Sequence, residues 1–274
     1  MQSELMQQLT ETAAFIKNIY PHKAEVGIIL GSGLGNLVSE MKVEEEIDYS
    51  DIPHFPVSTV MGHSGNLYFG ELSGKHVLVM AGRFHFYEGY TPQQVAYPVR
   101  VMKMLGIHTL LISNAAGGVN TSFKVGDLMI IKDHISFFTV NPLLGKNEDE
   151  LGLRFPDMSE PYCKTLIAKA KQIAAKIGYE VKEGVYTGVT GPTFETHAEY
   201  RFINILGGDA VGMSTVQEAI VAVHAGLKVF AVSVITDLGI REEDNKITHE
   251  EVLAAANEAE PTLTRLFKEL VGNI

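Results

Sequence analysis

Residues 26–30, VGIIL, run directly into residues 31–35, GSGLG, and this junction decides the fold. A continuous apolar run of this kind is typical of a β-strand that is covered on both faces. The glycines that follow let the backbone turn sharply and bring its amides close to an anion. A dinucleotide fingerprint would need glycine where this chain has Asn36, and the Lys-Ser/Thr pair of a P-loop does not follow. We therefore expect a phosphate-sized ligand here, with a plain tight turn as the alternative.

The same alternation of apolar run and helix start continues along the chain. Further buried strands are expected at residues 77–80, 109–113, 128–131, 185–190 and 229–235. Capping boxes predict helix starts at Thr91, Ser214, Thr196 and Thr248, and Pro98 is expected to kink the helix that begins near Thr91. The pattern predicts an α/β fold in which helices flank a mostly parallel sheet. Residues 1–274 are expected to form a single domain.

Composition excludes several classes of function. The chain has 22 Lys and Arg against 33 Asp and Glu, a formal net charge of −11, and no basic run, so we expect no nucleic-acid partner. The single cysteine, Cys163, excludes an internal disulfide framework and a cysteine-based zinc site. The N-terminal residues lack the pattern of a signal peptide, and no apolar stretch has the length of a membrane span. We expect a cytoplasmic protein without a membrane partner.

Charged and aromatic residues recur where the predicted strands end, which is where α/β proteins bind ligands. Arg83 and His85 follow the strand at 77–80, share one face of an extended chain, and together suit a phosphate group. His63, in GHSG at residues 62–65, is a further candidate, although a lone histidine is more often a surface or core residue. Asp237 emerges at the end of the strand at 229–235.

Other candidates carry stronger structural alternatives. Residues 114–118, NAAGG, combine small side chains with an accessible backbone, and a turn would explain the glycines but not the alanines. Phe194 and Glu195 offer a flat apolar face and a carboxylate, as a heterocycle with N–H donors requires, but a carboxylate is favoured at a helix start in any case. Ser214 is expected to cap the helix that follows, and an exposed His249 near a helix start would be ordinary.

Taken in order, these segments resemble the trimeric, low-molecular-mass purine nucleoside phosphorylases. The resemblance runs from about Val26 to the C-terminus. It rests on GSGLG at 31–35, HFP at 54–56, GHSG at 62–65, GRFHFYEGY at 82–90, NAAGG at 114–118, GPTFET at 191–196 and DAVGMSTV at 209–216. The family implies one α/β domain around a distorted, mixed, largely parallel β-barrel, assembled as a homotrimer. It implies phosphorolysis of purine ribonucleosides and deoxyribonucleosides in purine salvage, with inorganic phosphate as co-substrate and with neither metal nor organic cofactor.

The resemblance also implies roles for individual residues. Phosphate would be bound by Ser32, His63, Arg83, His85, the amide of Ala115 and Ser214. The ribose would be contacted by Tyr87, Met213, His249 and Phe155, the last inserted from a neighbouring subunit. The purine would face Phe194, Glu195 and Asp237, with Tyr186 and Val211 lining the pocket. Asp237, Glu195 and His85 would be the catalytic residues.

One position departs from the family pattern and leaves the base preference open. Members that prefer 6-oxopurines usually carry Asn where this chain has Asp237, whereas related phosphorylases of 5′-methylthioadenosine carry Asp. A 5′-methylthionucleoside phosphorylase is therefore one alternative, although it would need an apolar pocket in place of His249. A catalytically inactive nucleoside-binding module is another, but Ser32, Arg83 and His85 are all present. We expect inosine and guanosine as the main substrates.

Overall fold

The strand formed by the VGIIL run lies inside the sheet and is buried along its whole length. In the computed structural model, which describes residues 3–57, 65–240 and 247–274, β1 (Val26–Leu30) is buried at every position. It pairs in parallel with β4 (Lys75–Ala81) on one side and with β5 (Thr109–Gly118) on the other. The continuous apolar run is thus explained by helices and loops that cover both faces of the sheet.

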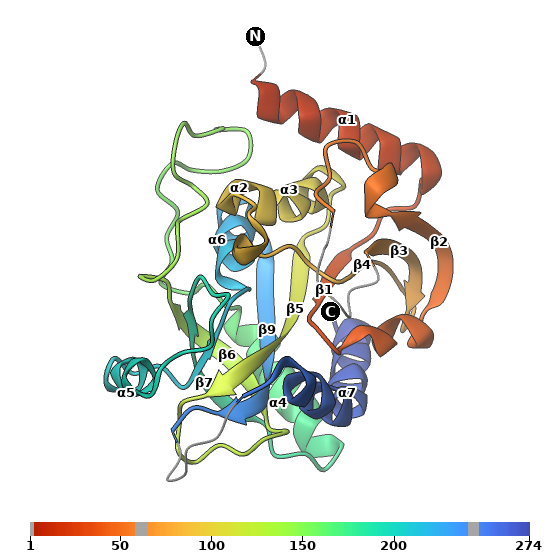
Figure 1. Ribbon diagram of the computed structural model, residues 1–274. Coiled ribbons are helices and arrows are strands. Elements are labelled where there is room, and N and C mark those ends of the chain that lie inside the picture. The colour runs from red at the N-terminus through yellow and green to blue at the C-terminus, as the bar shows by residue number, and fades with distance from the viewer. Residues whose placement is uncertain (1–2, 58–64, 241–246) are drawn as a thin grey trace.

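The sheet closes on itself at one end to form a barrel (Figure 1). β5 pairs in parallel with β9 (Lys228–Leu238) and antiparallel with β8 (Ala210–Gly212). β6 (Leu128–Ile135) and β7 (Lys182–Gly188) complete the ring between β9 and β8. The expected mixed sheet that forms a distorted barrel is confirmed.

At the other end, two strands that the sequence did not predict extend the sheet. β2 (Lys42–Asp48) and β3 (Asn66–Leu72) add to β4 by antiparallel pairing, in the order β2-β3-β4-β1-β5. β2 is an edge strand with Ile47 as its one buried residue, so it carries no apolar run. Its charged side chains suit an edge that must not pair with other chains.

Helices flank the sheet, and their starts agree in part with the capping signals. The α-helices are α1 (Glu4–Ile19), α2 (Pro92–Val95), α3 (Tyr97–Met104), α4 (Lys164–Lys176), α5 (His197–Ile205), α6 (Val216–His224) and α7 (His249–Gly272). Short 3₁₀ helices are η1 (Gly35–Glu40), η2 (Tyr49–Asp51) and η3 (Phe86–Glu88). The capping boxes at Thr91, Thr196 and Thr248 form as predicted. The helix expected to kink near Pro98 is divided at Ala96 into α2 and α3.

One prediction about local structure is wrong, and one alternative is excluded. α6 begins at Val216, with Thr215 rather than Ser214 at its N-cap, and no side chain caps it. Residues 114–118 are not a turn, because β5 continues through Gly118. A Cβ at Gly117 would lie 2.9 Å from Asp237 Oδ2 on the neighbouring strand, so a larger residue there would displace the Asp237 carboxyl group.

The helices pack on the sheet and on one another. α7 packs on β9 and α4, whereas α6 packs on β9 and α3. In the described part of the chain no helix has the length and apolar character that a membrane crossing requires.

Candidate active site

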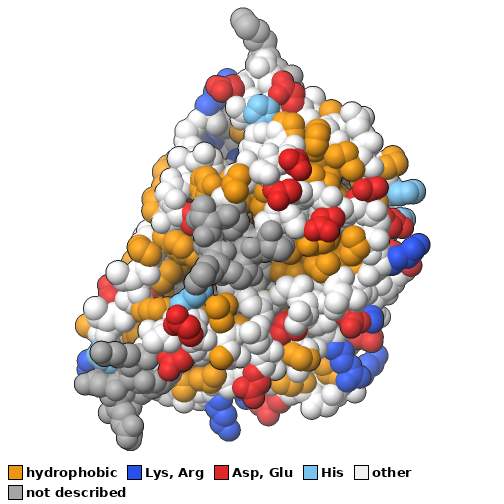
Figure 2. Space-filling view, turned by 45° about the vertical axis from the view of Figure 1, so that its right-hand side comes forward, with side chains coloured by type: hydrophobic (Ala, Val, Ile, Leu, Met, Phe, Trp, Pro, Cys, Tyr) orange, Lys and Arg blue, Asp and Glu red, His pale blue; other side chains and the backbone are white. Residues whose placement is uncertain are grey.

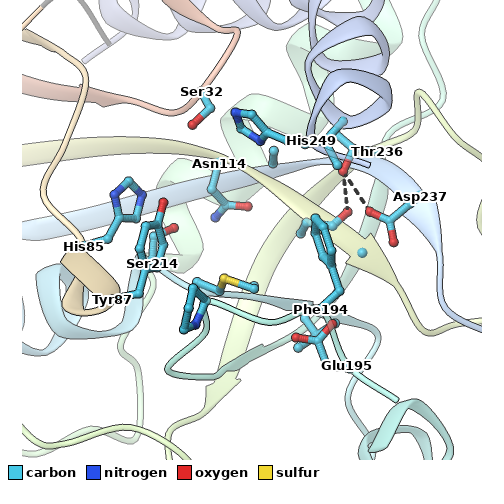
Figure 3. Close-up of a pocket in the computed structure, with 18 of the residues that line it drawn as sticks. Ser32, His85, Tyr87, Asn114, Phe194, Glu195, Ser214, Thr236, Asp237 and His249 are labelled. Carbon is cyan, nitrogen blue, oxygen red and sulfur yellow. Dashed lines mark hydrogen bonds between the residues drawn. The ribbon is translucent and has the colours of Figure 1, made fainter. Parts of the chain in front are cut away.

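A cavity of about 410 Å³ lies where β1, β4, β5 and β9 end, a volume suited to a small molecule (Figure 3). Segments far apart in the sequence supply its wall. It is lined by Ser32, Arg83, His85, Tyr87, Asn114, Ala115, Ala116, Gly117, Pro192, Phe194, Glu195, Tyr200, Val211, Gly212, Met213, Ser214, Thr236, Asp237, His249 and Val252. Within it, His85, Ser32, Asn114 and Ser214 lie toward one end, and Phe194, Glu195 and Asp237 lie toward the other.

Most of the predicted site residues meet in this cavity. The structure brings together Ser32, Arg83, His85, Tyr87, Ala115, Phe194, Glu195, Val211, Met213, Ser214, Asp237 and His249. His63 lies outside the described residues. Two predicted residues, Tyr186 and Phe155, are not in the wall of this cavity.

Tyr186 stands behind the cavity wall. Its side chain is fully buried, and its hydroxyl accepts a hydrogen bond of 3.3 Å from the Ser214 amide. A Cβ at Gly212 would lie 2.4 Å from that hydroxyl, so Gly212 separates Tyr186 from the cavity. Burial raises the pKa of Tyr186 to about 12, which keeps the phenol protonated at neutral pH. Instead of lining the pocket, Tyr186 supports the backbone that presents Ser214.

Phe155 lies on the surface of its own chain. Its side chain is 85% exposed, and the Arg154 guanidinium lies 5.6 Å from the centre of its ring. The loop that carries it is anchored to α6, because His224 Nε2 and Asn147 Oδ1 lie 3.0 Å apart. An exposed phenylalanine on an anchored loop is available to contact another molecule.

Arg83 enters the cavity wall from a buried ion pair. Its Nε and Nη2 donate to the two carboxylate oxygens of Glu218 at 3.0 and 3.1 Å, and Nη1 donates to the Ser113 carbonyl at 2.6 Å. Both side chains of the pair are at most 3% exposed. This bidentate geometry fixes the plane of the guanidinium. It also offsets the charge of the only Lys or Arg among the described residues that line the cavity.

His85 is held by the 3₁₀ turn that follows it. Its Nδ1 lies 2.9 Å from Glu88 Oε1, and its ring stacks on Tyr87 with 4.6 Å between centroids. Burial lowers the pKa of His85, although the Glu88 hydrogen bond acts in the opposite direction. The imidazole is therefore neutral at neutral pH. Donation from Nδ1–H to Glu88 then makes Nε2 the acceptor nitrogen.

At the other end of the cavity, a β-bulge turns two consecutive side chains inward. Ala116 pairs with Ile235 and Gly117 pairs with Asp237, so Thr236 is the extra residue on β9. Successive side chains of a regular strand point to opposite faces, whereas Thr236 and Asp237 both line the cavity. Thr236 donates a hydrogen bond of 3.1 Å to Asp237 Oδ1, which orients the carboxyl group.

Glu195 and Asp237 line the same end of the cavity. Burial raises the pKa of Glu195, and the charge of Asp237 raises it further. Hydrogen bonds from its own backbone amide and from the Tyr200 hydroxyl act in the opposite direction. The carboxyl group of Glu195 is therefore harder to ionise than that of an exposed glutamate.

Some residues of the cavity and its support were missed at the level of the sequence. Asn114 and Thr236 stood in the motifs but received no role, whereas Glu218, Tyr200 and Val252 were not considered. Glu218 carries the clearest signal, since it is the one carboxylate in the largely apolar helix α6 and is 2% exposed. A buried charge requires a partner, and the sequence could have suggested one.

The fold and the site agree with a match to a family model. Residues 25–272 match the model described as "Phosphorylase superfamily". This chain belongs to that superfamily. A purine nucleoside phosphorylase 1 of Geobacillus stearothermophilus is 52% identical to it over 266 residues, 97% of each chain. A purine nucleoside phosphorylase of Bos taurus is 46% identical over 271 residues, 96% of this chain and 94% of the relative.

Solved structures of related proteins share the complete fold. Purine nucleoside phosphorylase of Schistosoma mansoni in complex with adenosine superposes with a TM-score of 0.93 at 43% identity, covering 98% of both chains. The complex of that protein with inosine gives a TM-score of 0.92 at 42% identity, covering 98% of this chain and 97% of the other. The Schistosoma mansoni protein therefore binds both adenosine, which carries a 6-amino group, and inosine, which carries a 6-oxo group.

Proposed function

We propose that this protein is a purine nucleoside phosphorylase, which cleaves ribonucleosides and deoxyribonucleosides with inorganic phosphate to give the free base and the pentose 1-phosphate. The observation that carries the proposal is a single cavity with two chemically different ends. One end holds Ser32, His85 and Ser214, and Arg83 also lines the cavity; these side chains suit an anion. The other gathers Phe194, Glu195 and Asp237, which suit a purine.

The phosphate would lie beneath C1′ of the ribose. The C1′–N9 bond breaks toward an oxocarbenium-like sugar, and a phosphate oxygen held nearby stabilises this cation and then forms the bond to C1′. Holding both reactants in one cavity removes the entropy cost of their encounter, an effect of about 7–11 kcal/mol in well-oriented systems. The Ala115 amide and the hydroxyls of Ser32 and Ser214 would supply uncharged donors beside Arg83. His85 would act at the same anion.

The purine takes up the electron pair of the broken bond, so its negative charge must be stabilised. Asp237, when protonated, can donate a hydrogen bond to N7, and one such donor contributes about 3–4 kcal/mol to transition-state stabilisation. Glu195, when ionised, can accept from N1–H of a 6-oxopurine. This division of roles follows from what a 6-oxopurine offers, a donor at N1–H and an acceptor at N7.

We expect inosine and guanosine to be preferred, with some use of adenosine. Adenosine would present the bare N1 acceptor to Glu195, whereas its 6-amino group would suit Asp237. A buried charged acceptor that lacks a donor costs more than a neutral one, so we weight Glu195 more heavily. A 5′-methylthionucleoside phosphorylase remains the second candidate on the strength of Asp237. A panel of inosine, guanosine, adenosine and 5′-methylthioadenosine, each with phosphate, decides between them.

The decisive experiment measures hypoxanthine release from inosine with and without phosphate. We expect release to require phosphate, and Arg83→Ala to raise KM for phosphate far more than KM for inosine. Arg201→Ala is the matched control, because Arg201 is an exposed arginine on α5 outside the cavity wall. Cleavage at the full rate in phosphate-free buffer would instead identify a hydrolase.

We further propose a homotrimer in which Phe155 of one subunit covers the ribose in the next. The exposed ring on an anchored loop supports this assembly, and closed rings are the ordinary outcome of head-to-tail contacts. Sedimentation equilibrium should give a mass of about three times the 30.0 kDa chain. A fully active monomer would contradict the proposal. No metal or organic cofactor is required by this chemistry, and phosphate is the co-substrate.

A further inference from the structure

Asn114 lines the cavity, and its side-chain oxygen has no hydrogen-bond partner among the described residues. Its side chain is 1% exposed, and Nδ2 donates a hydrogen bond of 2.8 Å to the Thr215 hydroxyl. Its Oδ1 is buried and has no partner among the described residues. Asn114 nevertheless lines the cavity at the end that holds Ser32, His85 and Ser214 (Figure 3). A buried acceptor of this kind is costly without a donor, and a ligand at this end of the cavity can supply one.

The Thr215 hydroxyl lies between the side chains of Asn114 and Ser214, and the backbone of Thr215 is strained. Its φ of 71° and ψ of −47° are unusual for a β-branched residue, and the Val216 amide donates to the Ser214 carbonyl at 2.7 Å across it. The turn directs the Thr215 hydroxyl inward, 2.8 Å from Asn114 Nδ2 and 3.2 Å from Ser214 Oγ. Strain of this kind persists where the surroundings enforce it, often at a functional site.

The Thr215 hydroxyl has one proton and two acceptor lone pairs, so it donates to at most one of its two side-chain partners and accepts from the other or from both. If Asn114 donates to Thr215, then Asn114 Oδ1 is left to present an acceptor. Ser214 then either accepts from Thr215 and keeps its own proton for the cavity, or donates to Thr215 and presents a second acceptor. If the amide of Asn114 is turned over, Ser214 presents the acceptor and Asn114 Nδ2 the donor. Every arrangement presents at least one acceptor to the ligand, whichever way the amide is assigned.

We propose that this chain of three side chains makes the anion site selective for a tetrahedral oxyanion that carries a proton. Hydrogen phosphate and hydrogen arsenate have an O–H group for the acceptor end, whereas sulfate has none. Thr215 is then a specificity-determining residue that acts through Asn114 and Ser214 without touching the anion itself. The inference rests on the proposed function, because that function places an anion at this end of the cavity.

The test compares anions of equal charge on the purified full-length protein. Isothermal titration calorimetry is carried out at mildly alkaline pH, where phosphate and arsenate are mainly dianions with one proton. Sulfate and fluorophosphate are dianions without a proton, and fluorophosphate keeps the central phosphorus atom. We expect phosphate and arsenate to bind about tenfold more tightly than the other two, as one mispaired buried acceptor predicts. Affinities within about twofold for all four anions would overturn the proposal.

Variants at Thr215 test the coupling. Thr215→Val keeps the branched shape but removes the hydroxyl, so Ser214 and Asn114 can both turn a donor toward the anion. We expect the preference for phosphate over sulfate to fall to about threefold or less, whereas Thr215→Ser retains it. An undiminished preference in Thr215→Val contradicts the role of Thr215.

The two proposals fail separately. If inosine cleavage requires phosphate but sulfate binds as tightly as phosphate, only the selectivity chain is wrong. If cleavage does not require phosphate, the proposed function is wrong. The comparison of anions on the unmodified protein decides the selectivity even if Thr215→Val does not fold.

Discussion

Replacing Glu218 by glutamine tests how the fold holds a buried cation beside an anion site. Glu218 accepts two hydrogen bonds from Arg83, at 3.0 and 3.1 Å, and the two side chains are 3% and 2% exposed. Solvent therefore screens the pair very little. Removing one partner of a buried ion pair costs about 3–5 kcal/mol, because the remaining charge is left uncompensated.

The expected loss lies at the lower end of this range. Glutamine keeps one acceptor oxygen for Arg83, and the 2.6 Å hydrogen bond to the Ser113 carbonyl is unchanged. We expect the free energy of unfolding to fall by about 3 kcal/mol, which corresponds to a decrease in Tm of about 6–12 °C for a chain of this size. Glu183→Gln is the control, since its 3.1 Å pair with Lys171 is exposed and should contribute less than about 1 kcal/mol.

Phosphate gives the second measurement. A bound anion would compensate the charge that Glu218→Gln leaves on Arg83, so saturating phosphate should raise the Tm of the variant more than that of the unmodified protein. Thermal unfolding is followed at one fixed protomer concentration, with and without phosphate. Equal losses in the Glu218 and Glu183 variants would refute the argument about burial. A smaller phosphate effect in Glu218→Gln would refute the argument about compensation.

Three other predictions concern the purine and the ribose. Because burial raises the pKa of Glu195, kcat/KM for inosine should fall as the pH decreases through a value above the ordinary glutamate pKa of about 4.3. If the same acidic decrease in kcat/KM persists in Glu195→Gln, it does not arise from Glu195. Gly117→Ala would place a Cβ 2.9 Å from Asp237 Oδ2 and so displace the Asp237 carboxyl group. We expect kcat to fall about tenfold or more with little change in KM for phosphate. An unchanged kcat would show that the position of Asp237 is not important. His249→Ala should reduce kcat/KM for inosine more than for 5′-deoxyinosine, since an unmet polar group costs about 1–3 kcal/mol, and equal reductions would exclude a contact with the 5′-hydroxyl.

The sequence predicted those parts of the fold that depend on continuous burial. Strands such as β1 and β9 are covered on both faces, so their apolar runs are visible without knowledge of their neighbours. β2 was missed because it is a polar edge strand, and β8 because it is only three residues long. Capping boxes located helices well, except at Ser214, where Thr215 takes the N-cap position with a backbone conformation that propensity does not anticipate.

The candidate site could be predicted where motifs stand at strand ends, because parallel strands bring those ends together. The features of the site that could not be predicted depend on contacts between residues that are distant in the sequence. Arg83 and Glu218 are 135 residues apart, and nothing near Arg83 indicates that its charge is offset. The inward direction of both Thr236 and Asp237 also escapes the sequence, because it follows from a register shift between two strands rather than from local pattern.

The bulge at Thr236 has a consequence for how base preference can diverge within such a fold. Asp237 pairs with Gly117 through its backbone, so the strand pairing does not depend on the side chain at position 237. An exchange of Asp and Asn there alters the chemistry offered to a purine but leaves the barrel in register. Substitution at position 117 is more restricted, because a Cβ there would contact the Asp237 carboxyl group on the neighbouring strand. Random mutagenesis for new nucleoside substrates should therefore recover changes at 237 repeatedly and changes at 117 hardly at all.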